Sequence, residues 1–455
     1  MLKRLVMTGL LALAALLAAP SWAEEVVAAS AEVVQAAAPV AAAVTINKGD
    51  NSWMLLSAAL VILMSIPGLA LFYGGLVRSK NMLSVLMQVF TLFSLICVLW
   101  ILYGYSLAFT EGNSVYGSFS KALLKGVTPD SIAATFSKGV GISEFIYVVF
   151  QGAFAAITCG LIVGAFAERI KFAAVLVFMA IWFTINYVPM AHMGWGGGWV
   201  FQLGAQDFAG GNVVHVNVGI AALVGAWLVG SRKGVGTSAM APHNMTMTMT
   251  GGSLLWVGWL AFCGGCVLAA NGFSMLVVLN TMLAAAAGTL SWMLVEWVHR
   301  GRPSMLGAVS GAIAGLVAIT PACGFVGPMG AIAIGLIVSP ICVWAVEKLK
   351  PMIGLDDSFD VFGVHGVGGI VGGILTTVFA QPSLGGLGFA EGRDFGSQMQ
   401  VQLLVIGFSV VYSAISSFIA FKAASLICGG LRVEEDDEVE GLDMSSHGEP
   451  GYKLS

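Results

Sequence analysis

Two stretches of this sequence decide its fold: Asp207-Phe-Ala-Gly-Gly-Asn-Val-Val-His215-Val-Asn-Val-Gly219-Ile220 and Asp357-Ser-Phe-Asp-Val-Phe-Gly-Val-His365-Gly-Val-Gly-Gly369-Ile370. Both read Asp-x7-His-x3-Gly-Ile, and each opens an apolar segment long enough to cross a bilayer. These segments are the fifth and the tenth along the chain, so the repeating unit is five helices. Because five is odd, the second copy enters the membrane upside down, as in many transporters built from inverted repeats.

The composition independently places the chain in a membrane. Of 455 residues, 58% are hydrophobic and only 10% are charged, which is too little polar surface for a soluble fold of this length. The net charge of −4 is small and says little about partners, and the sequence shows no nucleic-acid-binding footprint. Glycines recur at four-residue spacing, which lets membrane helices approach closely. The examples are Gly160/Gly164, Gly307/Gly311/Gly315 and Gly368/Gly372.

Eleven apolar segments predict an all-α polytopic membrane protein with eleven transmembrane helices. A five-plus-five inverted repeat is followed by a long eleventh helix. Basic residues concentrate in alternate connections, so the positive-inside rule places the N-terminus outside and the C-terminus inside. The spans are centred near 53–73, 83–107, 145–167, 173–190, 211–229, 246–264, 274–295, 305–320, 329–346, 360–379 and 400–428.

The two ends of the chain differ from this core. Residues 1–23 resemble a secretory signal peptide, with Lys3 and Arg4 before an apolar run too short to span. An uncleaved first helix is the alternative. Residues 24–49 are expected to be a disordered periplasmic spacer and 50–430 the transmembrane domain. Residues 431–455 form a cytoplasmic tail whose acidic run, 434–438, predicts a solvated and flexible segment.

His215 and His365 are expected to meet near the membrane centre. A helix rises ~1.5 Å per residue, so each lies ~12 Å from its acid, at opposite faces of a core ~30 Å thick. One buried histidine is usually an ordinary packing residue. Two in matched positions of opposed halves favour a pathway for a small polar or cationic solute, because neutral imidazoles offer one donor and one acceptor each.

A metal site is the competing hypothesis for these imidazoles. It lacks a third ligand, because the other histidines fall at the outer face, in cytoplasmic connections or in the tail. These are His192, His243, His299 and His447. Three acids at cytoplasmic ends of spans lie beside basic residues and are interpreted as structural ion pairs. They are Glu168, Glu296 and Glu347.

The outer connection contains the remaining candidates. Asp207 has no cation near it in sequence, so it either caps its helix or supplies negative potential to a cation site. Trp195, among glycines at the surface, either anchors the chain at the interface or forms a cation–π wall. Phe150, Phe154 and Phe262 either extend that aromatic wall or belong to the core.

At these residues the chain resembles the ammonium transporter family (the Amt, Mep and Rh proteins), and specifically its bacterial Amt branch. The resemblance runs from about Asp50 to the tail and is carried by several motifs. They are Ile66-Pro-Gly-Leu-Ala-Leu-Phe-Tyr-Gly-Gly75, Gly164-Ala-Phe-Ala-Glu-Arg169, Ala191-His-Met with Trp195-Gly-Gly-Gly, Asp207-Phe-Ala-Gly-Gly211, Asp360-Val-Phe-Gly-Val-His365-Gly and Gly441-Leu-Asp-Met-Ser-Ser-His-Gly448.

The resemblance implies a homotrimer with one pore per subunit. It implies an external ammonium site at Trp195 and Phe154, supported by Asp207, and a gate of stacked rings formed by Phe154 and Phe262. Phe150 would support the vestibule. His215 and His365 match the twin histidines of the pore, and Asp357 is the inner repeat mate of Asp207.

The chain departs from the family at one position of the external site. Cys266 stands where the family usually has a serine whose hydroxyl accepts a hydrogen bond from ammonium, and Cys263 stands near a usual asparagine. A thiol is the weaker acceptor, so affinity or selectivity is expected to differ. Cys263 and Cys266 would face an oxidising compartment, and either a disulfide or two small apolar residues remains open.

The resemblance also implies function and partners. It implies an ammonium transporter in the inner membrane, not an enzyme and without a cofactor, in contact with membrane lipid. Its tail would dock on the neighbouring subunit and take part in block by a PII-type nitrogen regulatory protein. An ammonium sensor with weak or no transport is the alternative, although the tail leaves no room for a signalling domain.

Overall fold

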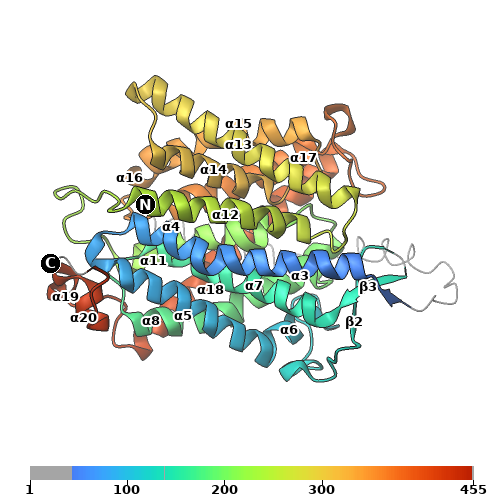
Figure 1. Ribbon diagram of the computed structural model, residues 1–455, viewed down its shortest axis with the longest axis horizontal. Coiled ribbons are helices and arrows are strands. Elements are labelled where there is room, and N and C mark those ends of the chain that lie inside the picture. The colour runs from blue at the N-terminus through green and yellow to red at the C-terminus, as the bar shows by residue number, and fades with distance from the viewer. Residues whose placement is uncertain (1–43, 138, 453–455) are drawn as a thin grey trace.

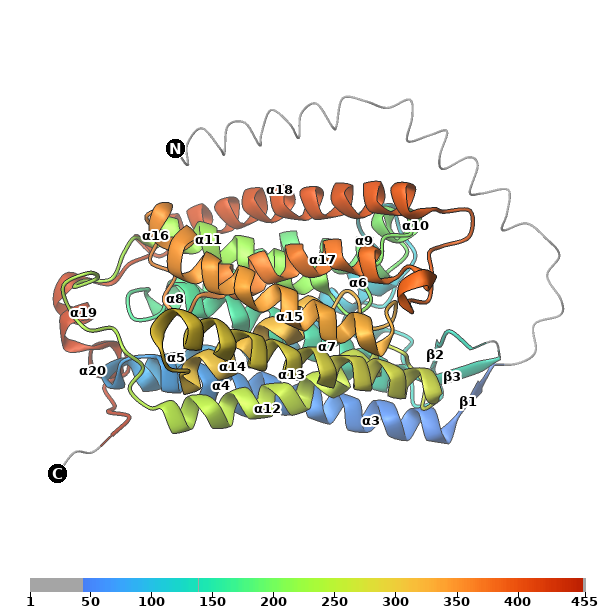
Figure 2. The same ribbon diagram turned by 90° about the horizontal axis from the view of Figure 1, so that it is seen from above.

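The computed structural model describes residues 44–137 and 139–452, which form one bundle of long, nearly aligned helices (Figure 1, Figure 2). The expected signal peptide and residues 24–43 of the expected spacer lie outside the described residues. Residues 44–49 of that spacer do not form a loop, because they contain strand β1 and the start of the first helix. In chain order the helices are α3 (Lys48–Leu63), α4 (Leu69–Leu76), α5 (Met82–Leu99), α6 (Tyr105–Phe109), α7 (Glu144–Ile162), α8 (Phe172–Trp182), α9 (Val188–Trp195), α10 (Trp199–Gln202), α11 (Asn217–Val229), α12 (Met245–Gly265), α13 (Gly272–Arg300), α14 (Met305–Ile319), α15 (Pro328–Trp344), α16 (Lys350–Met352), α17 (Val367–Phe379), α18 (Phe395–Ile427), α19 (Glu435–Glu440) and α20 (Leu442–His447).

Nine helical segments of the described chain are long and apolar enough to cross a membrane. Helices α12 and α14 are not among the nine. The first two turns of α12 carry three threonines, and α14 has only 15 residues. Both nevertheless pack between spanning helices, α12 against α3, α4 and α13, and α14 against α13, α15 and α17.

Matched irregularities support the expected duplication. A π-helical turn, 183–187, precedes α9, and another, 345–349, precedes α16, and each following helix carries a proline in its first turn. The two histidine segments behave alike. His215 and His365 lie in π-helical turns, 211–216 and 362–366, each followed by an α-helix of 13 residues. Corresponding elements of the two halves therefore share deviations that helix propensity alone does not predict.

A small sheet lies at one end of the bundle, opposite the end that carries α19 and α20 (Figure 1). It contains β1 (Thr45–Ile46), β2 (Ile132–Ala134) and β3 (Val140–Ser143) in the order β1-β3-β2. Strand β1 pairs with β3 in parallel and β2 pairs with β3 antiparallel, with Ala133 opposite Ile142. The prediction of an all-α chain is thus wrong for these three strands, which lie outside the helices long enough to cross a membrane.

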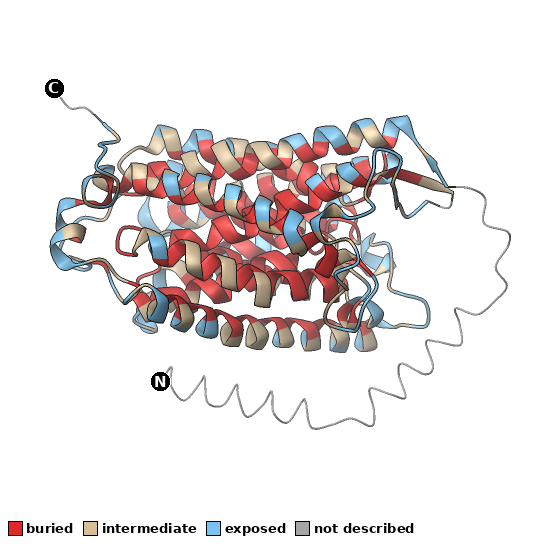
Figure 3. Ribbon diagram, turned by 90° about the horizontal axis from the view of Figure 1, so that it is seen from below, coloured by how far each residue is buried: buried red, intermediate tan, exposed pale blue. Residues whose placement is uncertain are grey.

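Burial follows the arrangement of a membrane bundle. Buried residues fill the inner faces of the helices, whereas exposed residues lie on outward faces and at both ends (Figure 3). Many exposed side chains on the long helices are large and apolar, among them Leu55, Phe90 and Leu290, which are 63%, 59% and 65% exposed. An apolar belt of this size requires lipid or a partner subunit around it.

Ion pairs hold the end opposite the sheet. Glu168 pairs with Arg78 and with Arg232, and Asp356 pairs with Arg232 through two short hydrogen bonds of 2.7 and 2.9 Å. Glu296 and Glu347 both pair with Arg300. The prediction that the three acids are structural partners of basic residues is confirmed.

The tail is folded, and the prediction of a solvated, flexible segment is wrong for its described part. Glu438 is 1% exposed, accepts a hydrogen bond from the Lys233 backbone and pairs with Arg432 at 2.6 Å. Asp443 accepts hydrogen bonds from the backbone of Leu83 and Ser84, which caps the start of α5. These specific partners outweigh the charge repulsion from which flexibility was inferred.

The two histidine helices cross where both carry glycine. A Cβ on Gly219 of α11 would lie 2.2 Å from the Gly366 backbone, and a Cβ on Gly369 of α17 would lie 3.0 to 3.1 Å from Val216 and His215. The glycine four positions after each histidine therefore packs against the segment that carries the other histidine. This reciprocal contact explains the His-x3-Gly pattern and brings the two π-helical turns together.

Candidate transport pathway

An acid caps each histidine turn. The Asp207 carboxylate accepts hydrogen bonds from the backbone N–H groups of residues 210–213. The sequence left two roles open for Asp207, helix capping and a source of negative potential for a cation site. These four hydrogen bonds are those of a helix cap. Burial raises the pKa of Asp207, and its backbone donors oppose that shift.

The inner acid repeats this arrangement with fewer donors. One oxygen of Asp357 accepts from the Phe362 backbone at 2.7 Å, and the other has no hydrogen-bond partner among the described residues. Both capping turns need a left-handed residue three positions after the acid, and it is Gly210 (φ 112°) in one and Asp360 (φ 61°) in the other. Aspartate tolerates this conformation better than most residues, so the turn survives without glycine.

The histidines meet as the repeat predicts. The Nδ1 atoms of His215 and His365 lie 3.2 Å apart, and their ring centres are 5.3 Å apart. Both side chains are buried, at 1% and 4% exposure. The imidazoles are within hydrogen-bond distance of each other inside the bundle.

The tautomers of a neutral pair follow from a residue that sequence analysis missed. The Thr320 hydroxyl donates its proton to the Leu316 carbonyl at 2.7 Å and accepts from Trp259 Nε1 at 2.9 Å. His215 Nε2 lies 3.3 Å from the same oxygen, which has no further proton to give. With the Thr320 proton on the Leu316 carbonyl, His215 donates through Nε2 and its bare Nδ1 accepts from Nδ1–H of His365.

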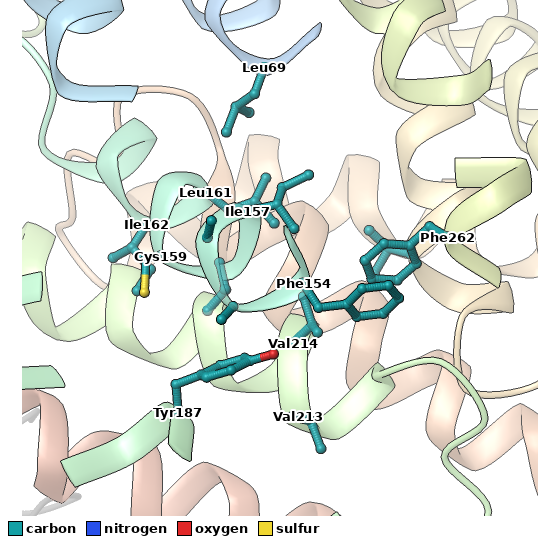
Figure 4. Packing of buried hydrophobic residues seen from close by; sticks show 14 of the residues in the cluster. Leu69, Phe154, Ile157, Cys159, Leu161, Ile162, Tyr187, Val213, Val214 and Phe262 are labelled. Atoms are coloured by element: carbon teal, nitrogen blue, oxygen red, sulfur yellow. The ribbon is translucent and has the colours of Figure 1, made fainter. Parts of the chain in front are cut away.

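Aromatic rings close the outer side of this pair. Phe154 and Phe262 are stacked, with centroids 3.8 Å apart and planes 11° from parallel (Figure 4). Trp195 stands edge-on to Phe154 at 6.1 Å, and its indole N–H donates to the Asp207 carbonyl at 3.3 Å. The acid's backbone therefore positions the tryptophan, and the expected gate residues are in contact.

A cavity of about 320 Å³ opens outside the rings. Trp195, Phe154 and Cys266 line it, as expected for an external site, whereas Phe150 does not and lies behind Phe154, 4.9 Å between ring centres. The full lining is Ala134, Thr135, Phe136, Tyr147, Gln151, Phe154, Trp195, Phe201, Phe208, Cys266 and Leu268. No charged side chain is among these described residues.

A second cavity, of about 290 Å³, lies on the other side of the histidines and is lined by His365. Its wall is charged, with Arg232, Glu296, Lys350 and Asp360 among the lining residues. The order from one cavity to the other is thus the stacked phenylalanines, then His215, then His365. Trp259 and Phe262 lie beside His215 on this path, with ring centres 5.1 and 6.5 Å from the imidazole.

Cys263 and Cys266 are free thiols in the structure. Cys266 Sγ donates to the Phe262 carbonyl at 3.2 Å and does not pair with Cys263. The described residues also contain no group of three or more histidine, cysteine or acidic side chains suited to a metal ion. The metal hypothesis therefore gains no third ligand.

Comparison with known proteins assigns the family. The model of the Ammonium Transporter Family matches residues 52–452, nearly all of the described chain. The chain belongs to the ammonium transporter family. An ammonium transporter of Bacillus subtilis is 47% identical over 90% of this chain and 99% of its own, and one of Aquifex aeolicus is 42% identical over 90% and 94%. The crystal structure of Candida albicans Mep2 is 35% identical, with a TM-score of 0.78 over 86% of this chain and 88% of that one.

These relatives confirm the family resemblance predicted from sequence, and with it ammonium transport, a membrane-spanning chain and a transporter rather than an enzyme. The sensor alternative is not favoured by relatives named ammonium transporters. In the structure His215 meets His365, and Phe154 lies against Phe262, Trp195 and Phe150, whereas Asp207 does not line the cavity. The sequence analysis missed Trp259, Thr320 and Gln151. The only signal for Thr320 was a hydroxyl at the end of an apolar, glycine-rich span.

Proposed function

We propose that this ammonium transporter family member binds ammonium in the outer cavity, deprotonates it there, and passes ammonia and the proton separately to the inner cavity. Trp195, Phe154 and Cys266 form the binding site, with Asp207 supporting it. Phe154 and Phe262 gate the passage. The observation that carries the proposal is the continuous order of outer cavity, stacked rings, His215, His365 and inner cavity.

The physical reason for deprotonation is desolvation. Moving an unpaired ion from water into an apolar medium costs on the order of tens of kcal/mol in the Born limit, whereas neutral ammonia has no such charge to desolvate. The stacked rings of Phe154 and Phe262, with centroids 3.8 Å apart, close the way to a hydrated cation. Potassium cannot lose a proton, so it remains outside.

The proton follows through the imidazoles. His215 donates to Thr320 and accepts from His365, so the pair is polarised in one direction. An inward transfer starts from the reversed pair: a proton from ammonium reaches bare Nε2 of His215 through water, Nδ1–H of His215 passes to Nδ1 of His365, and Nε2–H of His365 is released to the inner cavity. The assigned tautomers are the state that this transfer leaves, and water or imidazole rotation restores the reversed pair before the next one. Net transport is then electrogenic.

We infer the remaining organisation from sequence and family together. Residues 1–23 are a signal peptide, 24–49 a periplasmic segment, 50–430 the transporter domain and 431–455 a cytoplasmic tail. Helices α12 and α14 complete eleven spans, a five-plus-five inverted repeat with α18 as the eleventh. Strand β1 and helices α19 and α20 lie at opposite ends of the bundle (Figure 1), which supports an outer N-terminus and an inner C-terminus in the bacterial inner membrane.

The exposed apolar belt fits lipid and a homotrimer, and the folded tail offers a cytoplasmic surface to a PII-type nitrogen regulatory protein. Crosslinking in native membranes tests the trimer, and pull-down by a purified PII-type protein tests the partner.

The transport proposal is tested with purified protein in proteoliposomes on a solid-supported membrane. An ammonium pulse is expected to give a transient current, and an equal potassium pulse none. Equal currents for the two ions would contradict deprotonation at the outer cavity. No current with ammonium, with ammonia flux retained, would contradict the electrogenic route.

A further inference from the structure

The outer cavity needs hydrogen-bond acceptors if it is to hold ammonium. An ammonium ion carries four N–H donors, and aromatic faces satisfy only part of them. Cys266 is a poor substitute for a serine here, because its proton is committed to the Phe262 carbonyl and its sulfur is a weak acceptor. The Thr135 hydroxyl is already engaged within its own turn, where it donates to the Val140 carbonyl at 2.9 Å.

Gln151 is a neutral side chain in this lining with an unused strong acceptor, and the hydroxyl of Tyr147 beside it interacts with the Gln151 side chain. Tyr147, Gln151 and Phe154 are spaced four and three residues apart on α7, so they share one face, and all three line the cavity. Gln151 is 7% exposed, and its Oε1 has no hydrogen-bond partner among the described residues. Leaving a buried polar atom unpaired is costly, so a native site that retains one calls for a specific explanation.

We propose that Gln151 is a specificity-determining ligand of the outer site, where its amide oxygen accepts a hydrogen bond from ammonium. It takes over the part that a serine hydroxyl would play at position 266. This inference rests on the proposed function of the outer cavity. Oε1 is buried in the structure, so it is presented to the cavity by rotation about the last side-chain torsion, which exchanges the amide oxygen and nitrogen.

A neutral acceptor suits a site that must release a proton. A carboxylate would hold ammonium in its charged form, whereas an amide oxygen orients it without opposing deprotonation. The amide oxygen orients ammonium by accepting a hydrogen bond along its lone pair. Carbonyl oxygens also coordinate potassium, so the refusal of potassium rests on the deprotonation step.

The test compares two isosteric changes on one helix, with ammonium as the probe. Gln151→Leu removes the acceptor, and the control Thr158→Val removes a buried hydroxyl that donates to the Phe154 carbonyl at 2.6 Å and does not line the cavity. Solid-supported-membrane currents give the half-saturating ammonium concentration and the maximal current. Gln151→Leu is expected to raise the half-saturating concentration about tenfold, the effect of one hydrogen bond to a charged group, with Thr158→Val near wild type.

Rescue separates binding from damage to the fold. In the double variant Gln151→Leu, Cys266→Ser, a hydroxyl returns to the cavity, and the half-saturating concentration is expected to fall back toward wild type. An unchanged half-saturating concentration in Gln151→Leu, or a loss of maximal current that serine does not reverse, would overturn the assignment of Gln151. Absence of ammonium current in the wild-type protein would instead overturn the proposed function itself.

Discussion

Gly219 lies against Gly366 so closely that a Cβ on Gly219 would approach the Gly366 Cα to 2.2 Å. The contact is backbone to backbone, so no flexible side chain can yield. Because these glycines bring the two histidine turns together, the distance between the imidazoles depends on two residues that have no side chain.

Gly219→Ala is therefore expected to destabilise the protein by roughly 1–3 kcal/mol, the usual effect of overpacking a close-packed interior. Thermal unfolding in detergent measures it. Gly407→Ala on α18 is the matched control, because a Cβ there meets nothing within 4 Å. The control is expected to keep or slightly raise the unfolding temperature, since alanine favours helix. Equal effects of the two substitutions would argue against a tight crossing.

Thr320→Val tests the tautomer assignment. Valine matches the shape of threonine but leaves the Trp259 indole N–H and His215 Nε2 without their shared acceptor. Buried donors left unpaired cost about 1–3 kcal/mol each. Solid-state NMR of ¹⁵N-histidine-labelled protein is expected to show protonated Nε2 and bare Nδ1 on His215 in the wild type. In the variant the two tautomers mix, whereas a wild-type spectrum would refute the role of Thr320.

The raised pKa of Asp357 predicts that the stability of the protein depends on pH. Burial, followed by the charge of Asp360, raises the pKa of Asp357 to about 7. The folded state then binds a proton more tightly than the unfolded chain, so stability falls as pH rises from about 4 to 7 and is level above that. Asp356 adds no slope between pH 5 and 8. Although burial raises its pKa, Arg232 and Arg169 bring it down to about 2.

Asp357→Asn removes the ionisable group and keeps the side chain's shape. The loss of thermal stability between pH 5 and 8 is expected to shrink in this variant by the equivalent of a few kcal/mol at most, about 1.4 kcal/mol per pKa unit. Asp360 also has a raised pKa because of burial, so part of the slope persists. Asp394→Asn, at an exposed helix N-cap, is the control and is expected to leave the slope unchanged. The same slope in wild type and Asp357→Asn would show that the inner acid is ionised throughout.

Much of this architecture was predictable, because membrane helices are recognised by the length of their apolar segments and a duplication repeats its sequence motif. The meeting of His215 and His365 followed from helix rise and the odd number of helices per repeat. Three features were not predictable. The hydroxyl of Thr320 acts through a contact 105 residues away in sequence. The outer sheet is too short to produce an alternating pattern. The tail folds because Glu438 and Asp443 find distant partners, which composition does not reveal.

The most direct test of the account is the ammonium-induced current of His215→Ala in proteoliposomes, with the unfolding temperature measured to establish that the variant is folded. If the imidazole pair carries the proton, the current is lost, because the proton released from ammonium no longer has a relay between the cavities. A His215→Ala protein that gives wild-type current and still refuses potassium would contradict the account.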